Sequence, residues 1–352
     1  MKIARLAILF ILLLILLIIC AVILISCKND ENSPGHFVAA PSEREPNKPP
    51  SATESRLEGG VGEADGGSQT DKTAEITERR LFCKHTDLPE FYNSVQNPKE
   101  FKLNCEDGKA IIGGIVPHHM TAATLISGFF KAVAESGVKY DTVVIVAPNH
   151  QGETGDVVVS FKDWQAWDTV FCDRDILDGV YQKIQDNCGV TPTESDDRME
   201  EDHSVSGLIP YINYYMPESK VAAFLLSRRL TLETVFNFSG ILSDEIKEIN
   251  LSGKKVLFIC SVDFSHYLPV KSAAENDRIT EAAIIDRNYS AIHGFSNAYV
   301  DSPQSLNTFL MYLENIGTDK NNLEILYNTD ASEFLGDGIA ETTTYFIIAA
   351  YK

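Results

Sequence analysis

The sequence predicts an α/β domain in which a mainly parallel or mixed central sheet is flanked by helices. Short apolar runs rich in β-branched residues alternate with amphipathic stretches of helical period along residues 81–352. Several of these apolar runs end directly in polar, histidine-containing motifs. Alternation of strand and helix favours parallel strand pairing, with helices on both faces of the sheet.

The first strand–helix–strand unit is the clearest. Residues Ile111 to Val116 form an apolar run, and Ala122 to Glu135 have the helical period and end near Gly137. Tyr140 to Ala147 then give a second strand. We therefore expect the strands on either side of this helix to lie parallel in one sheet.

The remaining elements follow the same alternation, without an evident internal repeat. The predicted helices are 175–185, 203–215, 232–249, 273–288 and 304–316. The predicted strands are 220–226, 254–260, 323–328 and 342–351.

The N-terminus predicts membrane targeting. Lys2 and Arg5 precede an uninterrupted apolar stretch over residues 6–25, close to the roughly 20 residues that cross a bilayer as a helix. Residues 24–27 (Leu-Ile-Ser-Cys) resemble a bacterial lipobox, in which Cys27 is lipidated after cleavage. A cleaved lipoprotein and an uncleaved signal anchor both remain open, and both place the rest of the chain outside the cytoplasm at the cell membrane.

The composition then divides the chain into three parts. Residues 1–27 are a signal peptide with lipobox or a membrane anchor, and 28–80 are a disordered linker rich in Asn, Ser, Pro, Gly and acidic residues. Residues 81–352 are long enough for one α/β domain. The net charge of -20 argues against a nucleic-acid partner, because binding a phosphate backbone requires a positive surface.

Cysteines give a weaker signal. The domain has no CxxC pair, so neither a zinc ribbon nor a disulfide framework is indicated. In an oxidising compartment Cys83 could pair with Cys105, or Cys172 with Cys188.

Polar motifs carry the functional signal: VPHH at 116–119, APNH at 147–150, EEDH at 200–203 and SVDFSH at 261–266. The first, second and fourth follow predicted strands, and α/β sheets bind ligands beyond the carboxyl ends of their strands. A single histidine in such a place more often caps a helix or binds a carbonyl, but several at one rim indicate a metal site. The predicted set is His118, His150 and His203, joined by Asp263 or His266.

Neighbouring residues in these motifs have weaker assignments. Glu201 and Asp202 could orient imidazoles, or their carboxylates could interact favourably with the positive N-terminal end of the following helix. Glu200 is expected only to interact with the N-terminal end of that helix. His119 is expected to point away from its neighbour in the chain, and His85, near the linker, is assigned no function.

The order of the motifs resembles the Memo-like family, called AmmeMemoRadiSam system protein B in prokaryotes. The resemblance spans residues 110–352 and rests on Pro-His, Pro-Asn-His-Gln-Gly, Glu-Asp-His-Ser with Leu-Ile-Pro-Tyr, and Asp-Phe-Ser-His-Tyr, with Ala274 and Asp277 downstream. It implies the fold of the class III extradiol dioxygenases, whose non-heme iron is held by two histidines and a carboxylate. It also implies iron or copper binding, as in Memo proteins themselves.

Carried over residue by residue, the resemblance implies metal ligands at His118, His150 and His203. In eukaryotic members a cysteine precedes the histidine of the fourth motif and serves as a ligand, and here Ser265 stands at that position. Loss of the thiolate, with Asp263 retained, shifts the metal preference from copper(I) towards iron(II) or zinc. The predicted metal residues are thus His118, His150, His203, Asp263 and Ser265, and the expected cofactor is a divalent metal, with iron preferred and copper or zinc as alternatives.

Three functions remain open. An iron or copper centre would support redox chemistry, with His203, His266 and Asp263 as catalytic residues. A zinc centre would instead activate water for hydrolysis, with Asp263 or Glu201 as the base. Alternatively, a cell-surface module held by the N-terminal anchor uses the cleft to capture a peptide or small ligand without turnover.

Overall fold

Parallel strands form the middle of the sheet, in the order β2 (Ile111–Val116), β9 (Val256–Ser261), β3 (Thr142–Pro148) and β8 (Lys220–Leu226). The computed structural model describes residues 79–105, 109–152, 156–187, 189–336 and 338–352, and these belong to one compact unit. Along β3, Val143 and Ile145 pack into one core layer, and Val144 and Val146 pack into the other. Strands covered on both faces need apolar residues at every position, which explains the β-branched runs.

Antiparallel strands extend the sheet, so the sheet is mixed. β12 (Thr342–Tyr351) pairs with β2, β10 (Phe264–Leu268) and β11 (Leu323–Asp330). At the other edge, β4 (Val157–Val159) is antiparallel to β8 and parallel to β7 (Pro192–Glu194). A separate small sheet contains β1 (Leu81–Phe82), β5 (Trp164–Gln165) and β6 (Thr169–Val170). The predicted fold class of a helix-flanked, mainly parallel or mixed sheet is confirmed as the mixed form.

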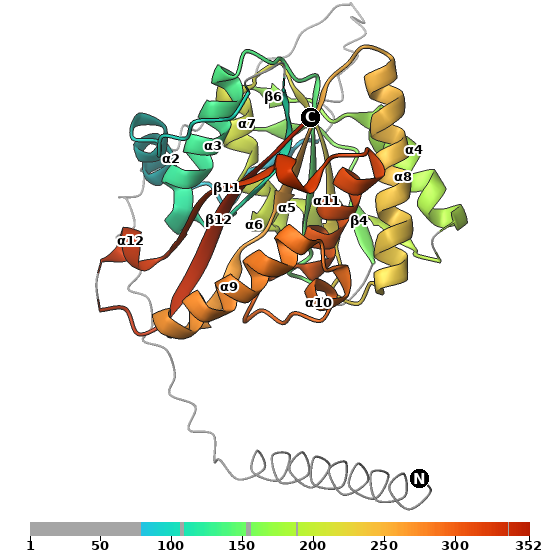
Figure 1. Cartoon of the computed structure of the whole chain (residues 1–352). Coiled ribbons are helices and arrows are strands. Elements are labelled where there is room, and N and C mark those ends of the chain that lie inside the picture. The colour runs from blue at the N-terminus through green and yellow to red at the C-terminus, as the bar shows by residue number, and fades with distance from the viewer. Residues whose placement is uncertain (1–78, 106–108, 153–155, 188, 337) are drawn as a thin grey trace, which may run out of the picture. The chain divides into compact units, whose positions relative to one another are not determined.

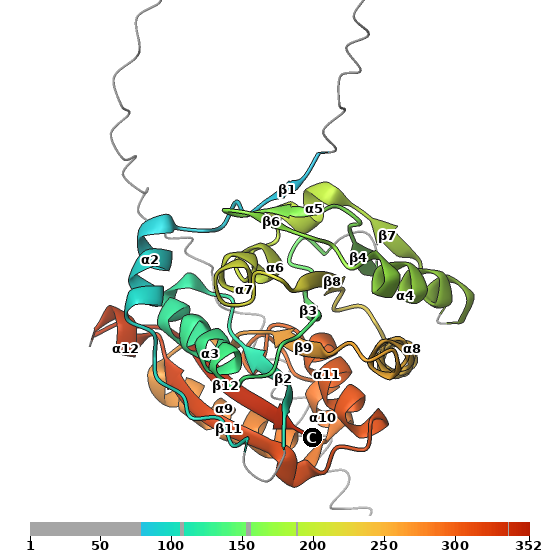
Figure 2. The same cartoon turned by 90° about the horizontal axis from the view of Figure 1, so that it is seen from above.

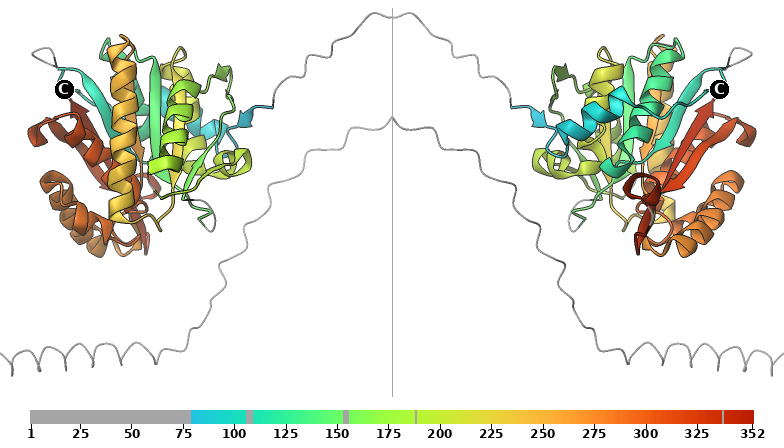
Figure 3. Two further views of the ribbon diagram at one scale, coloured as in Figure 1. Left: turned by 90° about the vertical axis from the view of Figure 1, so that its right-hand side faces the viewer. Right: turned by 90° about the vertical axis from the view of Figure 1, so that its left-hand side faces the viewer.

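Helices cover both faces of the central sheet (Figures 1 and 2). One face is covered by α3 (Ala123–Glu135) and α7 (Ile209–Tyr215), with α2 (Leu88–Gln96) packed on α3. The other is covered by α4 (Arg174–Asn187), α8 (Leu232–Leu251) and α11 (Pro303–Asn315). Figure 3 shows α8 lying alongside the strands. The remaining helices are α9 (Val270–Asp286), α10 (Tyr289–His293), η2 (Met120–Ala122), α5 (Asp196–Glu201), α6 (His203–Ser206), η3 (Lys320–Asn322) and α12 (Ser332–Leu335).

The predicted helix over 203–215 is two helices in the structure. α6 ends at Ser206 and α7 begins at Ile209, with Pro210 in its first turn. Proline is favoured there because its missing N–H has no partner within the first turn of a helix. His203 is the first residue of the short helix α6, whose N-cap is Asp202.

Glycines in β2 allow a helix and a neighbouring strand to approach closely. A Cβ on Gly114 would lie 2.4 Å from Phe129 Cζ of α3, and one on Gly113 would lie 2.3 Å from the carbonyl oxygen of Phe258 in β9. Any larger residue would push these elements apart. The two glycines therefore fix the strand that leads into the first histidine motif.

Some predictions fall outside the described residues, namely the N-terminal anchor, the lipidation of Cys27 and nearly all of the linker. No helix within the described ranges is both long and apolar enough to cross a membrane. Cys83, Cys105 and Cys172 are free thiols, so the suggested bridge between Cys83 and Cys105 is absent; Cys188 is not described.

Candidate metal centre

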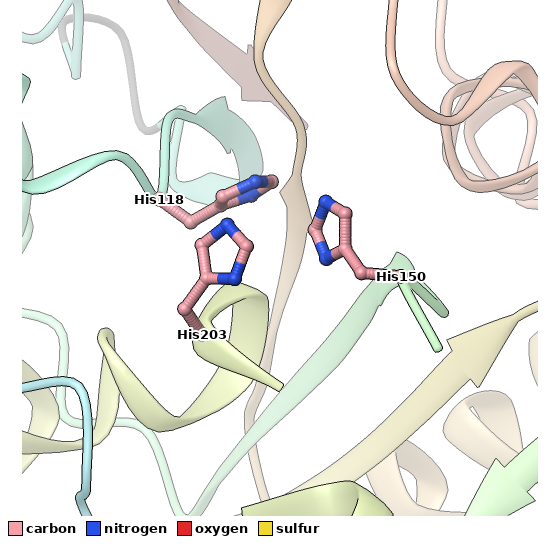
Figure 4. Close-up of side chains that lie close together, drawn as sticks. All are labelled: His118, His150 and His203. Carbon is pink, nitrogen blue, oxygen red and sulfur yellow. The ribbon is translucent and has the colours of Figure 1, made fainter. Parts of the chain in front are cut away.

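Three histidines meet beyond the carboxyl ends of β2 and β3 (Figure 4). His118 follows β2, His150 follows β3, and His203 begins α6. Each offers a ring nitrogen within 4.8 Å of those of the other two. Metal–imidazole bonds are about 2.0–2.1 Å long, so two nitrogens bound to one ion lie at most about 4.2 Å apart, and the separations here come within about 0.6 Å of that limit or below it. The structure thus brings together the three histidines that the motifs predict.

The ring of His118 is buried and oriented by Ser261. The Ser261 hydroxyl donates to the backbone carbonyl of Ser204 at 2.6 Å, so it can only accept at His118 Nδ1, 3.1 Å away. Nδ1 therefore carries a proton, and Nε2 of the neutral ring presents its lone pair to the centre. This Nε2 is buried and has no hydrogen-bond partner in the described part of the chain.

His150 is oriented by Asp202. Its ring Nδ1 lies 2.9 Å from Asp202 Oδ1, and its backbone N–H donates to Asp202 Oδ2 at 2.9 Å. Burial raises the pKa of Asp202, but hydrogen bonds from His150 and Ser204 outweigh burial and hold the pKa well below its usual value. An ionised carboxylate only accepts, so His150 Nδ1 is protonated and Nε2 is left as a ligand. Asp202 therefore orients an imidazole, one of the two roles predicted for it.

His203 packs between the other rings. Its ring is stacked on His150 with centroids 4.3 Å apart and an interplanar angle of 21°, and its centroid is 5.0 Å from that of His118. Burial, followed by the nearby His118 and His150, lowers the pKa of His203 to about 3. The ring is therefore neutral at physiological pH, as a metal ligand must be.

Two buried carboxylates face the His118 ring. His118 Nε2 lies 3.2 Å from Asp301 Oδ2 and 3.5 Å from Asp263 Oδ2, and Asp301 Oδ2 is also 3.9 Å from His150 Nε2. A lone pair and carboxylates this close repel one another unless a proton or a metal cation lies between them. Burial lowers the pKa of His118, but Asp263 and Asp301 outweigh burial and raise it to about 9. A proton fills this position without metal, and the donor set fits a cation equally well.

The sequence does not predict Asp301, which belongs to the convergent group His118, Asp263 and Asp301. It follows the short helix α10 and precedes Ser302, the N-cap of α11, so it does not stand at the end of an apolar strand. Its backbone N–H donates to the Asp263 carbonyl at 3.0 Å, and its Oδ2 accepts from the Asp263 N–H at 3.2 Å. These long-range contacts place it at the site.

His266 belongs to neither of the two convergent groups of histidines and carboxylates. The Ser265 hydroxyl donates to Asp277 Oδ1 at 2.7 Å, and the same carboxylate accepts from Thr344 and Asn328. The Ser265 hydroxyl is therefore held by the Asp277 carboxylate. His266 Nδ1 is buried without a hydrogen-bond partner in the described part.

Within the described residues, the convergent groups contain only histidine and aspartate. Cys260 lies in β9 and is buried in the core layer that includes α8 and α11. Neither group therefore offers a thiolate.

Comparison with known proteins gives a consistent family match. The model of the family described as Memo-like protein matches residues 85–333. A MEMO1 family protein of Methanosarcina barkeri is 28% identical over 250 residues, covering 68% of this chain and 88% of that protein. One of Pyrobaculum aerophilum is 26% identical over 211 residues, covering 57% and 69%. The crystal structure of an uncharacterized protein from Escherichia coli K12 aligns with a TM-score of 0.46 and 11% identity over 68% of this chain and 99% of that chain.

Proposed function

The chain belongs to the Memo-like family, and we propose that its domain binds a divalent metal at the histidine cluster and uses it in redox chemistry. The supporting observation is the buried Nε2 of His118, which faces two carboxylates and has no hydrogen-bond partner among the described residues. A bound cation would neutralise the carboxylates and accept the lone pair in one contact.

We assign His118, His150, His203 and Asp301 as the ligand set. Histidines combined with a carboxylate are typical of non-heme iron(II), whereas copper(I) prefers sulfur ligands. Iron(II) is therefore the preferred metal, with copper and zinc as alternatives. Iron bound here would supply redox chemistry and open positions for a substrate.

The chain's own residues would orient the ligands and move protons. Ser261 and Asp202 hold His118 and His150 in the tautomer that directs Nε2 to the centre. Asp263 lies 3.5 Å from the His118 ring nitrogen, so its carboxylate is placed to take a proton beside the centre. His266, whose Nδ1 is unpartnered in the described part, is the second candidate for proton transfer.

Elemental analysis of the full-length chain, purified in detergent without chelator or affinity metal, tests this proposal. We expect stoichiometric iron or copper in the parent protein and its loss in His118→Ala. His293→Ala is the matched control, because His293 lies on α10 outside the convergent groups. Equal metal content in parent and His118→Ala, or no metal after reconstitution, would contradict the proposal.

A zinc hydrolase is the second candidate, since three histidines are also a ligand set of catalytic zinc. Its supporting observation is the convergence of the three ring nitrogens. Asp263 would then act as the base towards a zinc-activated water. Stoichiometric zinc, with turnover that continues without dioxygen, would favour this candidate over redox chemistry.

We also propose that the domain is displayed outside the cytoplasm by the N-terminal segment. The supporting features are Lys2, Arg5 and the apolar stretch over residues 6–25. Incorporation of labelled fatty acid that is lost in Cys27→Ala would support a lipoprotein. Digestion of the domain by protease added to intact spheroplasts tests the location, and full protection would contradict it.

A further inference from the structure

The three histidines of the proposed metal site are not oriented in the same way. His118 is held through Nδ1 by Ser261, and His150 through Nδ1 by Asp202. In the described part of the chain, no hydrogen bond is made to the ring of His203. Metal-binding histidines nearly always have such a partner, which fixes the direction of the ring. One feature of the chain does contact the His203 ring on a side away from the other two ligands.

That feature is the ring of His85. The two ring centroids are 5.8 Å apart with an interplanar angle of 61°, so the rings meet edge to face. On another side, His203 stacks on His150. His85 is itself fixed, because its Nε2 lies 2.8 Å from the backbone carbonyl of Glu201 and must donate to it.

His85 belongs to a segment, residues 79–87, that we call the N-terminal strap. Glu200, only 1% exposed, receives the Arg79 guanidinium at 2.7 Å and the Phe82 backbone N–H at 3.1 Å. Lys84 pairs with Glu201. The strap is thus fastened to α5, the helix that ends just before Asp202 and His203.

We propose that the N-terminal strap is part of the metal centre, with His85 as the positioning residue of His203 and Glu200 as the anchor of the strap. The inference rests on the proposed function, because it assigns to His203 a role in binding metal. It also explains the first two acids of the EEDH motif: Glu200 and Glu201 hold the strap, while Asp202 holds His150. The segment that enters the domain from the linker would then support one of the metal ligands.

The first test measures the affinity of the full chain for cobalt(II), by competition with a chromophoric chelator, together with the visible spectrum of the bound ion. The spectrum depends on the geometry of the ligands, so a change reports on ring positions and not merely on fold stability. We expect His85→Ala to weaken binding about tenfold, as is usual for residues that orient ligands, and to alter the spectrum. Glu200→Gln should shift both in the same direction.

Two further variants sharpen this test. His85→Phe keeps an aromatic edge against His203 but removes the bond to Glu201, so it should restore part of the parent affinity and spectrum. His293→Ala should match the parent in both. Parent-like affinity and spectrum in His85→Ala would overturn the inference, while cobalt binding by the parent would leave the proposed metal site intact.

A second readout needs no metal. Diethyl pyrocarbonate modifies neutral imidazoles, and mass spectrometry can follow the modification of His203 in the metal-free chain. We expect faster modification of His203 in His85→Ala than in the parent, because the covering ring has gone. An unchanged rate would count against the strap even if the parent bound no metal, which separates failure of this inference from failure of the proposed function.

Discussion

Asp202 binds His150 twice, with Oδ1 2.9 Å from the ring Nδ1 and Oδ2 2.9 Å from the backbone nitrogen. The two contacts fix both the loop that follows β3 and the tautomer of the ring. Asp202 Oδ1 also accepts from the Ser204 N–H at 3.0 Å as the N-cap of α6. One carboxylate thus connects two of the three histidines.

Asp202→Asn should weaken metal binding by roughly 10- to 100-fold, the range typical of residues that orient metal ligands. Whichever way the amide is turned, its NH₂ group faces either the backbone N–H or the Nδ1–H of His150, so one contact is lost. Chelator competition measures the change. Asp244→Asn, at an exposed position of α8, is the control, and equal affinities in the two variants would refute this role.

Asp301→Asn should weaken metal binding more than Asp263→Asn. Asp301 Oδ2 lies near both His118 Nε2 and His150 Nε2, whereas, among the described residues, Asp263 forms an ion-pair contact with His118 alone. Metal dissociation constants for the two variants, measured in the same buffer, give the order directly. A larger loss in Asp263→Asn would identify Asp263 as the ligand in place of Asp301.

Metal affinity should rise with pH up to about 9, because the neighbouring carboxylates outweigh burial and hold the pKa of His118 at about 9. Below this pH a metal must displace one proton from His118, so the affinity should rise about tenfold per pH unit if no other group titrates. Isothermal titration in buffers of different ionisation enthalpy counts the released protons. Binding to the parent without proton release would show that His118 is not a ligand.

The metal-free protein should lose stability relative to His118→Gln as pH rises from about 6.5 to 9. A histidine whose pKa is raised on folding stabilises the folded state fully below its unfolded pKa, about 6.5. That contribution is lost as pH rises through the folded value of about 9. Urea unfolding of both proteins across this window should show the difference between their stabilities changing in this direction, and a constant difference would contradict it.

Gly114→Ala should destabilise the domain by about 1–3 kcal/mol, the usual cost of overpacking a core. The added Cβ would lie 2.4 Å from Phe129 Cζ and 2.7 Å from the Ile348 carbonyl oxygen. Gly240→Ala in α8 is the control: its Cβ meets nothing within 4 Å, and alanine favours a helix by up to about 1 kcal/mol. Urea unfolding measures both changes, and equal effects would contradict the steric argument.

The sequence predicts the parts of the site that follow strands. His118 and His150 were identifiable because each comes directly after an apolar run, and parallel strands end at the same rim. Asp301 cannot be identified in this way, because it reaches the rim through tertiary contacts with Asp263 and Arg228, which no local pattern encodes.

Two further features have the same origin. The hydroxyl of Ser265, which the resemblance implies as a ligand, donates to the buried Asp277, and the motif does not encode this contact. Nothing near His85 marks it as part of the site, since its neighbours Glu201 and His203 are more than a hundred residues away in the chain. Motifs therefore predicted the strand ends, while residues that support them from distant segments became visible only in the fold.

β12 is the last strand of the sheet along the chain, yet it lies between β2 and β11 and also pairs with β10. One neighbour of β2, the strand β12, therefore lies more than two hundred residues further along the chain. The loop that carries His118 directly follows β2, so its position depends on this pairing between distant segments. Domain assembly, and with it the capacity to take up a metal, should therefore depend on contacts between segments that are distant in the chain, a feature that slows folding.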